Sequence, residues 1–211
     1  MTRTTLAYIA AALLGTAPLA AQTAPTGWEW RPERGAAAQA ADTTASFTQM
    51  PPGWHFTSGA PGLLLPADER ASGAFSLAAD FVVFPETSGS GFGILLGGED
   101  FDGAAETYLA ALLRRDGSVS VIRRRNGADS VLVPWTRHAA IPAHPGTGTV
   151  THRLRVRALR DSLRLVVNDS VVATAALGDA ATDGRFGFRI GERVNLHVTI
   201  LDYIRHLAPA R

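Results

Sequence analysis

The sequence contains no cysteine and no lysine among its 211 residues. Without cysteine there is no disulfide, no thiol nucleophile and no residue for lipid attachment, so stability must come from packing of the core. Every one of the 20 basic residues is therefore arginine, against 19 acidic residues. This near-balance of charge argues against a nucleic-acid partner and against electrostatic docking on an anionic membrane.

The sequence also has no apolar stretch as long as the ~20 residues that a membrane-spanning helix needs. A short apolar run at residues 6–14 follows a single positive charge, Arg3, and precedes small residues that end at Ala21. This layout is typical of a secretory signal peptide. We predict that residues 1–21 are a signal peptide and that the mature protein is exported to the periplasm or beyond the cell.

Familiar catalytic and metal-binding motifs are missing as well. There is no Gly-x-Ser-x-Gly nucleophile elbow, and the glycine-rich stretch 89–93 is not followed by a helical pattern, which excludes nucleotide binding of the usual kind. The six histidines lie at positions 55, 138, 144, 152, 197 and 206, without the i, i+2 or i, i+4 spacing of a zinc site. We therefore predict no metal site and no cofactor, with a structural calcium in a loop as the alternative.

Turn residues and short β-type runs make up the rest of the chain, with no long segment of helical period. Residues 22–45 are rich in small residues and predict a mobile segment or an edge strand near Trp28 and Trp30. Residues 46–207 predict one domain, with strands at 74–84, 91–96, 108–115, 118–124, 153–158, 163–167, 171–175, 184–190 and 196–201. In 153–158 the polar/apolar alternation predicts that Leu154, Val156 and Ala158 point inward, and Asn168-Asp169 is predicted to turn the chain between 163–167 and 171–175. So many strands favour an all-β fold, a two-sheet antiparallel jelly-roll sandwich.

The dipeptide Asp116-Gly117 is the strongest single hairpin signal. It suits a two-residue type I′ turn, in which both residues have positive φ. Such a turn pairs Ala110 with Arg123 and so places Arg123 on the same face as Tyr108. This pair would suit an anionic or polyhydroxylated ligand, the alternative being that Arg123 is a solvated strand end.

The order of glycines and aromatic residues along the chain resembles a known family. The pieces are Gly53-Trp54, Ser72–Phe75, Gly91–Gly93, Gly97–Asp100, Asp116-Gly117, Trp135, Val167-Asn168 and Asp183–Gly187. They resemble the concanavalin A-like jelly rolls, most closely the bacterial exported domains grouped with 3-keto-disaccharide hydrolases, over residues 46–207. The resemblance implies a fold more than a chemistry.

Candidate site residues are few. Glycoside hydrolysis needs two opposed carboxyl groups, but the acidic cluster with Glu99 and Asp100 lies in a predicted loop, so these two and His138 are weak catalytic candidates. The alternatives for the cluster are a calcium or sugar-hydroxyl site and a solvated turn. Trp135 and His138 are predicted to share a proline-rich loop with His144, and could stack on and hydrogen-bond a sugar.

Trp54 and His55 carry the same two interpretations as Trp135, sugar contact or core packing. The sequence thus favours an exported, non-catalytic jelly-roll module that contacts carbohydrate or a cell-surface glycan. The first alternative is a glycoside or 3-keto-disaccharide hydrolase, and the second is a structural domain of the cell envelope. The ligand-binding candidates are Trp54, His55, Tyr108, Arg123, Trp135 and His138.

Overall fold

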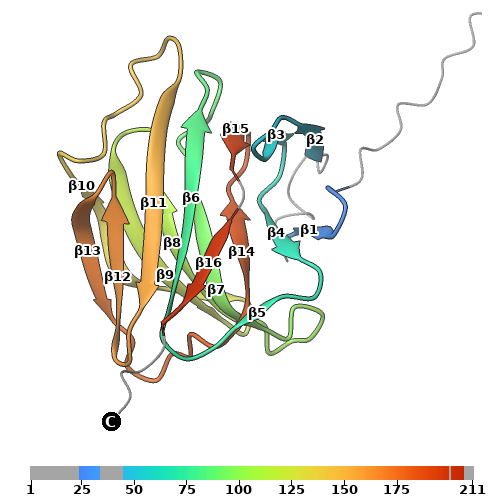
Figure 1. Cartoon of the computed structure of the whole chain (residues 1–211), viewed down its shortest axis with the longest axis vertical. Coiled ribbons are helices and arrows are strands. Elements are labelled where there is room, and N and C mark those ends of the chain that lie inside the picture. The colour runs from blue at the N-terminus through green and yellow to red at the C-terminus, as the bar shows by residue number, and fades with distance from the viewer. Residues whose placement is uncertain (1–23, 34–44, 200, 207–211) are drawn as a thin grey trace, which may run out of the picture.

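The computed structural model describes residues 24–33, 45–199 and 201–206 of the chain. Over these residues it contains strands and turns but no helix, arranged as two stacked antiparallel sheets (Figure 1). The predicted all-β jelly-roll sandwich is confirmed. No helix of the described residues is long and apolar enough to cross a membrane. The predicted signal peptide lies outside the described residues.

Sheet A has eight strands, with the order β1-β4-β14-β7-β8-β9-β10 and β5 pairing with β14. The strands are β1 (Trp28–Pro32), β4 (Gly62–Pro66), β5 (Arg70–Ala71), β7 (Phe92–Glu99), β8 (Thr107–Leu113), β9 (Ser118–Arg125), β10 (Ala128–Arg137) and β14 (Gly184–Ile190). Strand β1 therefore lies at one edge of the sheet and β10 at the other.

Sheet B also has eight strands, with the order β13-β12-β11-β6-β15-β3-β2 and β16 pairing with β6. The strands are β2 (Ala45–Gln49), β3 (Trp54–Ser58), β6 (Phe75–Val83), β11 (Val150–Ala158), β12 (Ser162–Val167), β13 (Ser170–Ala176), β15 (Val194–Val198) and β16 (Asp202–Arg205). The last predicted strand, 196–201, is wrong in its end, because β15 stops at Val198 and a separate strand, β16, begins at Asp202.

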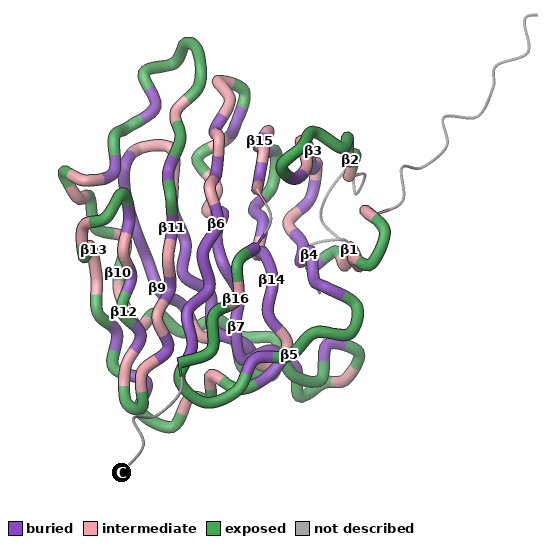
Figure 2. The backbone as a smooth tube through the Cα atoms, viewed as in Figure 1, coloured by how far each residue is buried: buried purple, intermediate pink, exposed green. Residues whose placement is uncertain are grey.

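The main core lies between the sheets and follows from alternation along each strand. In β11, Leu154, Val156 and Ala158 are buried while the arginines between them face away, as predicted. Figure 2 shows that the inner strands of the two sheets, such as β6, β7 and β14, are mostly buried. The largest inward-facing side chains are aromatic, and they include Phe56, Phe75, Phe81, Phe92, Phe186 and Phe188.

A second, smaller apolar cluster covers the face of sheet A that points away from sheet B, here called the outer face of sheet A. It consists of Leu63, Leu65, Leu95, Phe101, Tyr108, Ala110, Leu112 and Ile122, with Trp135 packed against it. A sheet face that met only water would carry polar side chains at these positions. The apolar side chains therefore indicate that this part of the outer face of sheet A is shielded from water.

The β8–β9 hairpin differs from its prediction by one residue. Gly117 has φ +84°, but Asp116 is not among the residues with positive φ. The Arg114 amide donates to the Ser118 carbonyl, so the loop has three residues and ends in a left-handed glycine. Ala110 consequently pairs with Ile122 rather than with Arg123. This shift exchanges the two faces of β9 relative to β8.

Replacing Gly117 with alanine is expected to destabilise the protein by about 2 kcal/mol, because a left-handed backbone is unfavourable for residues with a Cβ atom. A Cβ atom here would also lie 2.5 Å from the Ile141 carbonyl oxygen. Urea unfolding measures the change. Gly127→Ala is the control, because Gly127 has φ +77° with open space around it. An equal loss in both variants would contradict a steric contribution at Gly117.

Candidate functional site

The outer face of sheet A holds a network of hydrogen-bonded and ion-paired side chains, most of them buried. Its members are Glu33, Glu106, Tyr108, Arg124, Asp129 and Arg189. They come from strands β8, β9, β10 and β14 and from the segments next to β1 and β8. Residues distant in the sequence are thus brought together by the sheet order.

Glu33 is the centre of this network. It follows β1 directly, and its amide donates to the Pro61 carbonyl at 2.9 Å, which holds it against the sheet. The Tyr108 hydroxyl donates to Glu33 Oε1 at 2.5 Å. Arg189 Nη2 donates to both carboxylate oxygens of Glu33, at 3.0 and 3.1 Å. Burial, together with the charge of Glu33, raises the pKa of Tyr108 far above its ordinary value, so its hydroxyl keeps its proton.

Arg124 links the network to two further carboxylates. Its Nε donates to Glu106 Oε2 at 3.2 Å, and its Nη1 donates to Asp129 Oδ1 at 3.1 Å. The β8–β9 and β9–β10 registers place Tyr108, Arg124 and Asp129 in one row across the sheet. Although burial opposes the charge of Arg124, its anionic neighbours keep its pKa above the ordinary value of arginine.

A hollow of about 260 Å³ opens beside this network. Glu106 lines it, so a buried member of the network is also in contact with the hollow. Leu63 and Phe101 supply apolar surface, and Arg31 forms an ion pair with Asp102 there. The hollow therefore offers apolar surface, carboxylates and a guanidinium. The full lining is Trp30, Arg31, Pro32, Leu63, Phe101, Asp102 and Glu106.

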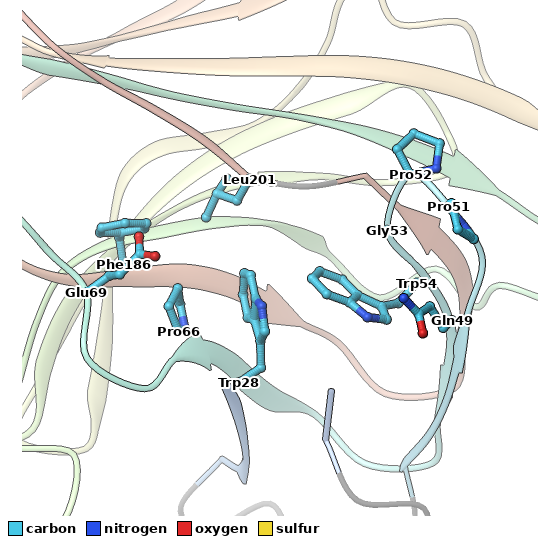
Figure 3. Close-up of a pocket in the computed structure, with 10 residues that line it drawn as sticks. All are labelled: Trp28, Gln49, Pro51, Pro52, Gly53, Trp54, Pro66, Glu69, Phe186 and Leu201. Carbon is cyan, nitrogen blue, oxygen red and sulfur yellow. The ribbon is translucent and has the colours of Figure 1, made fainter. Parts of the chain in front are cut away.

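A second pocket, of about 320 Å³, lies between the sheets beside β1 and β3 (Figure 3). Trp28 and Trp54 contact each other edge to face there, with ring centroids 5.1 Å apart, and Trp28 also stacks on Phe188. Glu69 and Gln49 are polar side chains in its lining, which otherwise consists of Trp28, Pro51, Pro52, Gly53, Trp54, Pro66, Phe186 and Leu201. The pocket continues the aromatic core and offers few hydrogen-bonding groups.

The weak catalytic candidates are not brought together. Glu99 ends β7 and pairs with Arg70, and Asp100 turns the following loop, its carboxylate accepting from the Ala105 amide. His138 lies beyond the other end of the hairpin, where its amide donates to the Gly117 carbonyl. Glu99 is opposite Thr107 at the far end of β8, about 20 Å away along the strand. These three side chains cannot act on one bond.

The aromatic and histidine candidates are dispersed too. Trp135 lies in strand β10, not in a loop with His138 and His144, which corrects the prediction. Its ring lies on the outer face of sheet A, with the Arg114 guanidinium 3.7 Å from the ring centroid. His55 packs its ring edge-to-face against Phe84 on sheet B.

The predicted proximity of Tyr108 and Arg123 is wrong. Tyr108 is opposite Arg124 in the β8–β9 register. Arg123 points to the other face of the sheet, where it forms an ion pair with Asp179. Sequence reasoning missed Glu33, Glu106, Arg124, Asp129 and Arg189. Correct registers of the β8–β9 and β9–β10 hairpins would have identified Arg124, Glu106 and Asp129. Glu33 and Arg189 depend on the order of strands, which local patterns do not contain.

The described residues hold no group of three or more histidine, aspartate or glutamate side chains that could bind a metal ion. The buried carboxylates of the network are already paired with guanidiniums. What the network provides is a set of fixed donors and acceptors in a region with little water, where such groups act more strongly than at an exposed surface.

Comparison with known proteins supports the fold. No protein-family model and no curated protein matches this chain. Among solved structures, the carbohydrate-binding module CBM66 from Bacillus subtilis is similar with a TM-score of 0.60 and 18% identity, over 85% of this chain and 96% of that one. The exoplasmic/lumenal domain of VIP36, in a Ca²⁺/Man3GlcNAc-bound form, has a TM-score of 0.58 and 12% identity over 90% and 89% of the two chains.

A larger protein also contains this fold. The GH43 protein BlXynB from Bacillus licheniformis is similar with a TM-score of 0.56 and 13% identity, over 88% of this chain but 38% of that one. At identities this low, the structural similarity shows a common fold, and function has to be argued from the site. The chain has a galectin-like and concanavalin A-like sandwich fold.

Proposed function

We propose that this protein is a non-catalytic module that binds carbohydrate at the hollow beside the buried network. The observation that carries the proposal is the position of Glu106, which lines the hollow while its carboxylate is held by Arg124. A purely structural sheet face would be served as well by apolar side chains, because buried ion pairs seldom stabilise a fold more than apolar residues of similar volume. The presence of buried charged side chains beside the hollow therefore favours a ligand that interacts with them.

Carbohydrate fits the chemistry of the hollow. Sugar hydroxyl groups both donate and accept hydrogen bonds, and here carboxylates of Glu106 and Asp102 stand beside the guanidinium of Arg31. The apolar faces of a sugar ring require a flat hydrophobic partner, and the lining of the hollow includes the aromatic rings of Trp30 and Phe101. Because the Glu106 carboxylate is held by Arg124 of the network, this side chain needs little further ordering on binding. The similar folds named above include proteins whose names or bound ligand refer to carbohydrate.

The alternative of a glycoside hydrolase is supported less. It would require two carboxyl groups on opposite sides of a scissile bond. Glu33 and Glu106 are the buried carboxylates available, and both are held by the same guanidinium, that of Arg124. Membership of the exported 3-keto-disaccharide hydrolase-like group also remains a proposal, and it is supported no better than the glycoside hydrolase alternative. Export itself also remains a prediction, since it depends on residues 1–21.

A glycan array followed by calorimetric titration tests the proposal. We expect at least one glycan to bind the wild-type protein. Glu106→Gln is expected to weaken its binding by about 10- to 100-fold, the value of a hydrogen bond to a charged group. Asp102→Asn, at a side chain that is 88% exposed, should weaken binding without affecting stability. Urea unfolding of both variants separates loss of binding from loss of fold.

Trp54→Ala is the matched control, because Trp54 lines the aromatic pocket and not the hollow. Unchanged affinity in this variant supports the hollow as the site. If Trp54→Ala abolished binding while Glu106→Gln retained it, the site would be the aromatic pocket. Absence of binding to every glycan would refute the carbohydrate proposal and favour a structural domain.

A further inference from the structure

The β11–β12 hairpin of sheet B carries arginines that have no partner within the described residues. Arg155, Arg157, Arg160 and Arg164 contact no carboxylate, carbonyl or aromatic ring there. Every other described arginine except Arg205 has such a contact, for example Arg185 with Glu29 and Arg115 with two carbonyl groups. In a chain whose charges almost cancel, the unpaired positive charge is thus concentrated on one hairpin.

Three of these side chains form a compact group on the face of sheet B that points away from the core. The alternation of β11 turns Arg155 and Arg157 outward, about 7 Å apart along the strand. Arg164 is directly opposite Arg157 on β12, a separation of about 5 Å between Cβ atoms. We call these three residues the arginine triad.

No carboxylate neutralises the triad from the neighbouring strands. Asp80 of β6 and Asp202 of β16 are the acidic residues nearby, and both pair with Arg153. The residues beside Arg155 across the sheet are Val166 and Ala78. Like charges placed opposite each other on paired strands are unfavourable. The isolated fold therefore gains nothing from the triad, whereas an anionic ligand would.

We propose that the arginine triad binds an acidic polysaccharide, one with carboxylate groups repeated along its chain. A guanidinium can form two parallel hydrogen bonds with a carboxylate, and three guanidiniums on a flat sheet can contact several groups of one extended polymer. The triad lacks the aromatic neighbours on which the bases of single-stranded nucleic acid stack. It is also smaller than the clusters of four to eight basic residues that dock on anionic membranes.

This surface is on the opposite sheet from the hollow beside Glu106, so the two sites can be tested separately. The probe is polygalacturonate, with neutral dextran as its uncharged counterpart, titrated at low and at moderate NaCl. We expect polygalacturonate alone to bind, more weakly as salt rises. The triple variant Arg155→Gln, Arg157→Gln, Arg164→Gln should bind about tenfold more weakly. Its stability in urea should not fall, because a like-charge contact is removed.

The control variant removes three positive charges at other places on the surface: Arg70→Gln, Arg125→Gln, Arg137→Gln. These arginines are exposed, and each forms an ion pair, with Glu99, Asp179 and Asp116 respectively. This variant should retain wild-type affinity, since net charge is matched and only the position differs. The proposal is overturned if polygalacturonate does not bind, if both triple variants lose affinity equally, or if duplex DNA or vesicles with anionic lipid bind through the triad more tightly than polygalacturonate.

Discussion

Replacing Arg189 with methionine should destabilise the protein by about 3–5 kcal/mol, because it leaves the buried Glu33 carboxylate without its bidentate partner. Only 6% of the Glu33 side chain is exposed, so water cannot replace the lost guanidinium. Urea unfolding at pH 7 measures the loss. The loss is large because the Glu33 carboxylate stays buried without its closest guanidinium, while only the Tyr108 hydroxyl and the more distant Arg124 remain as partners.

Two further variants test that explanation. Arg153→Met removes an ion pair with Asp80 at a side chain that is 45% exposed, and should cost no more than about 1 kcal/mol. The double variant Glu33→Leu, Arg189→Met removes both charges and should be more stable than Arg189→Met alone. Equal losses for Arg153→Met and Arg189→Met would show that burial of the network has no energetic consequence.

Lowering the pH from 6.5 to 4 should reduce stability by about 3 kcal/mol through a single residue, His152. This side chain is fully buried, and neither ring nitrogen has a hydrogen-bond partner among the described residues. Burial and, to a smaller extent, the nearby His144 lower the pKa of His152 from its ordinary value of 6.5 to about 4. The unfolded chain therefore takes up the proton first as the pH falls, and the stability present above pH 6.5 is progressively lost.

His152→Leu identifies the source of this dependence. The variant cannot titrate at this position, so its free energy of unfolding should fall less steeply between pH 6.5 and 4 than that of the wild type. Urea unfolding at several pH values gives the two curves. His138→Leu, at a histidine outside the core, should follow the wild type. Parallel curves for wild type and His152→Leu would contradict the assignment.

Comparison of prediction and structure shows where local pattern is sufficient. Alternation alone placed Leu154, Val156 and Ala158 in the core, because a strand has only two faces and water selects between them. The Asn168-Asp169 turn was also placed correctly, and both residues have positive φ. In each case the information lies within a few residues of the chain.

The β8–β9 hairpin shows how a small local error becomes a large one at the site. One residue more in the turn moves Arg123 away from Tyr108 and brings Arg124 to it. The side-chain period of a strand is two, so a shift of one residue exchanges every contact on both faces. Asp116-Gly117 is compatible with both loops, and the bond from the Arg114 amide to the Ser118 carbonyl distinguishes them.

The amino-acid sequence by itself determined the fold class, most strand positions and the inward residues of strands with strict alternation such as β11, because turn chemistry and hydrophobic alternation act over short distances. Only the tertiary structure decided that Glu33, Tyr108 and Arg189 meet, since β1, β8 and β14 are brought together by the order of strands in sheet A. It also decided which arginines are paired and which are not. Charges interact through space, and the partners of each charge are set by packing rather than by its neighbours along the chain.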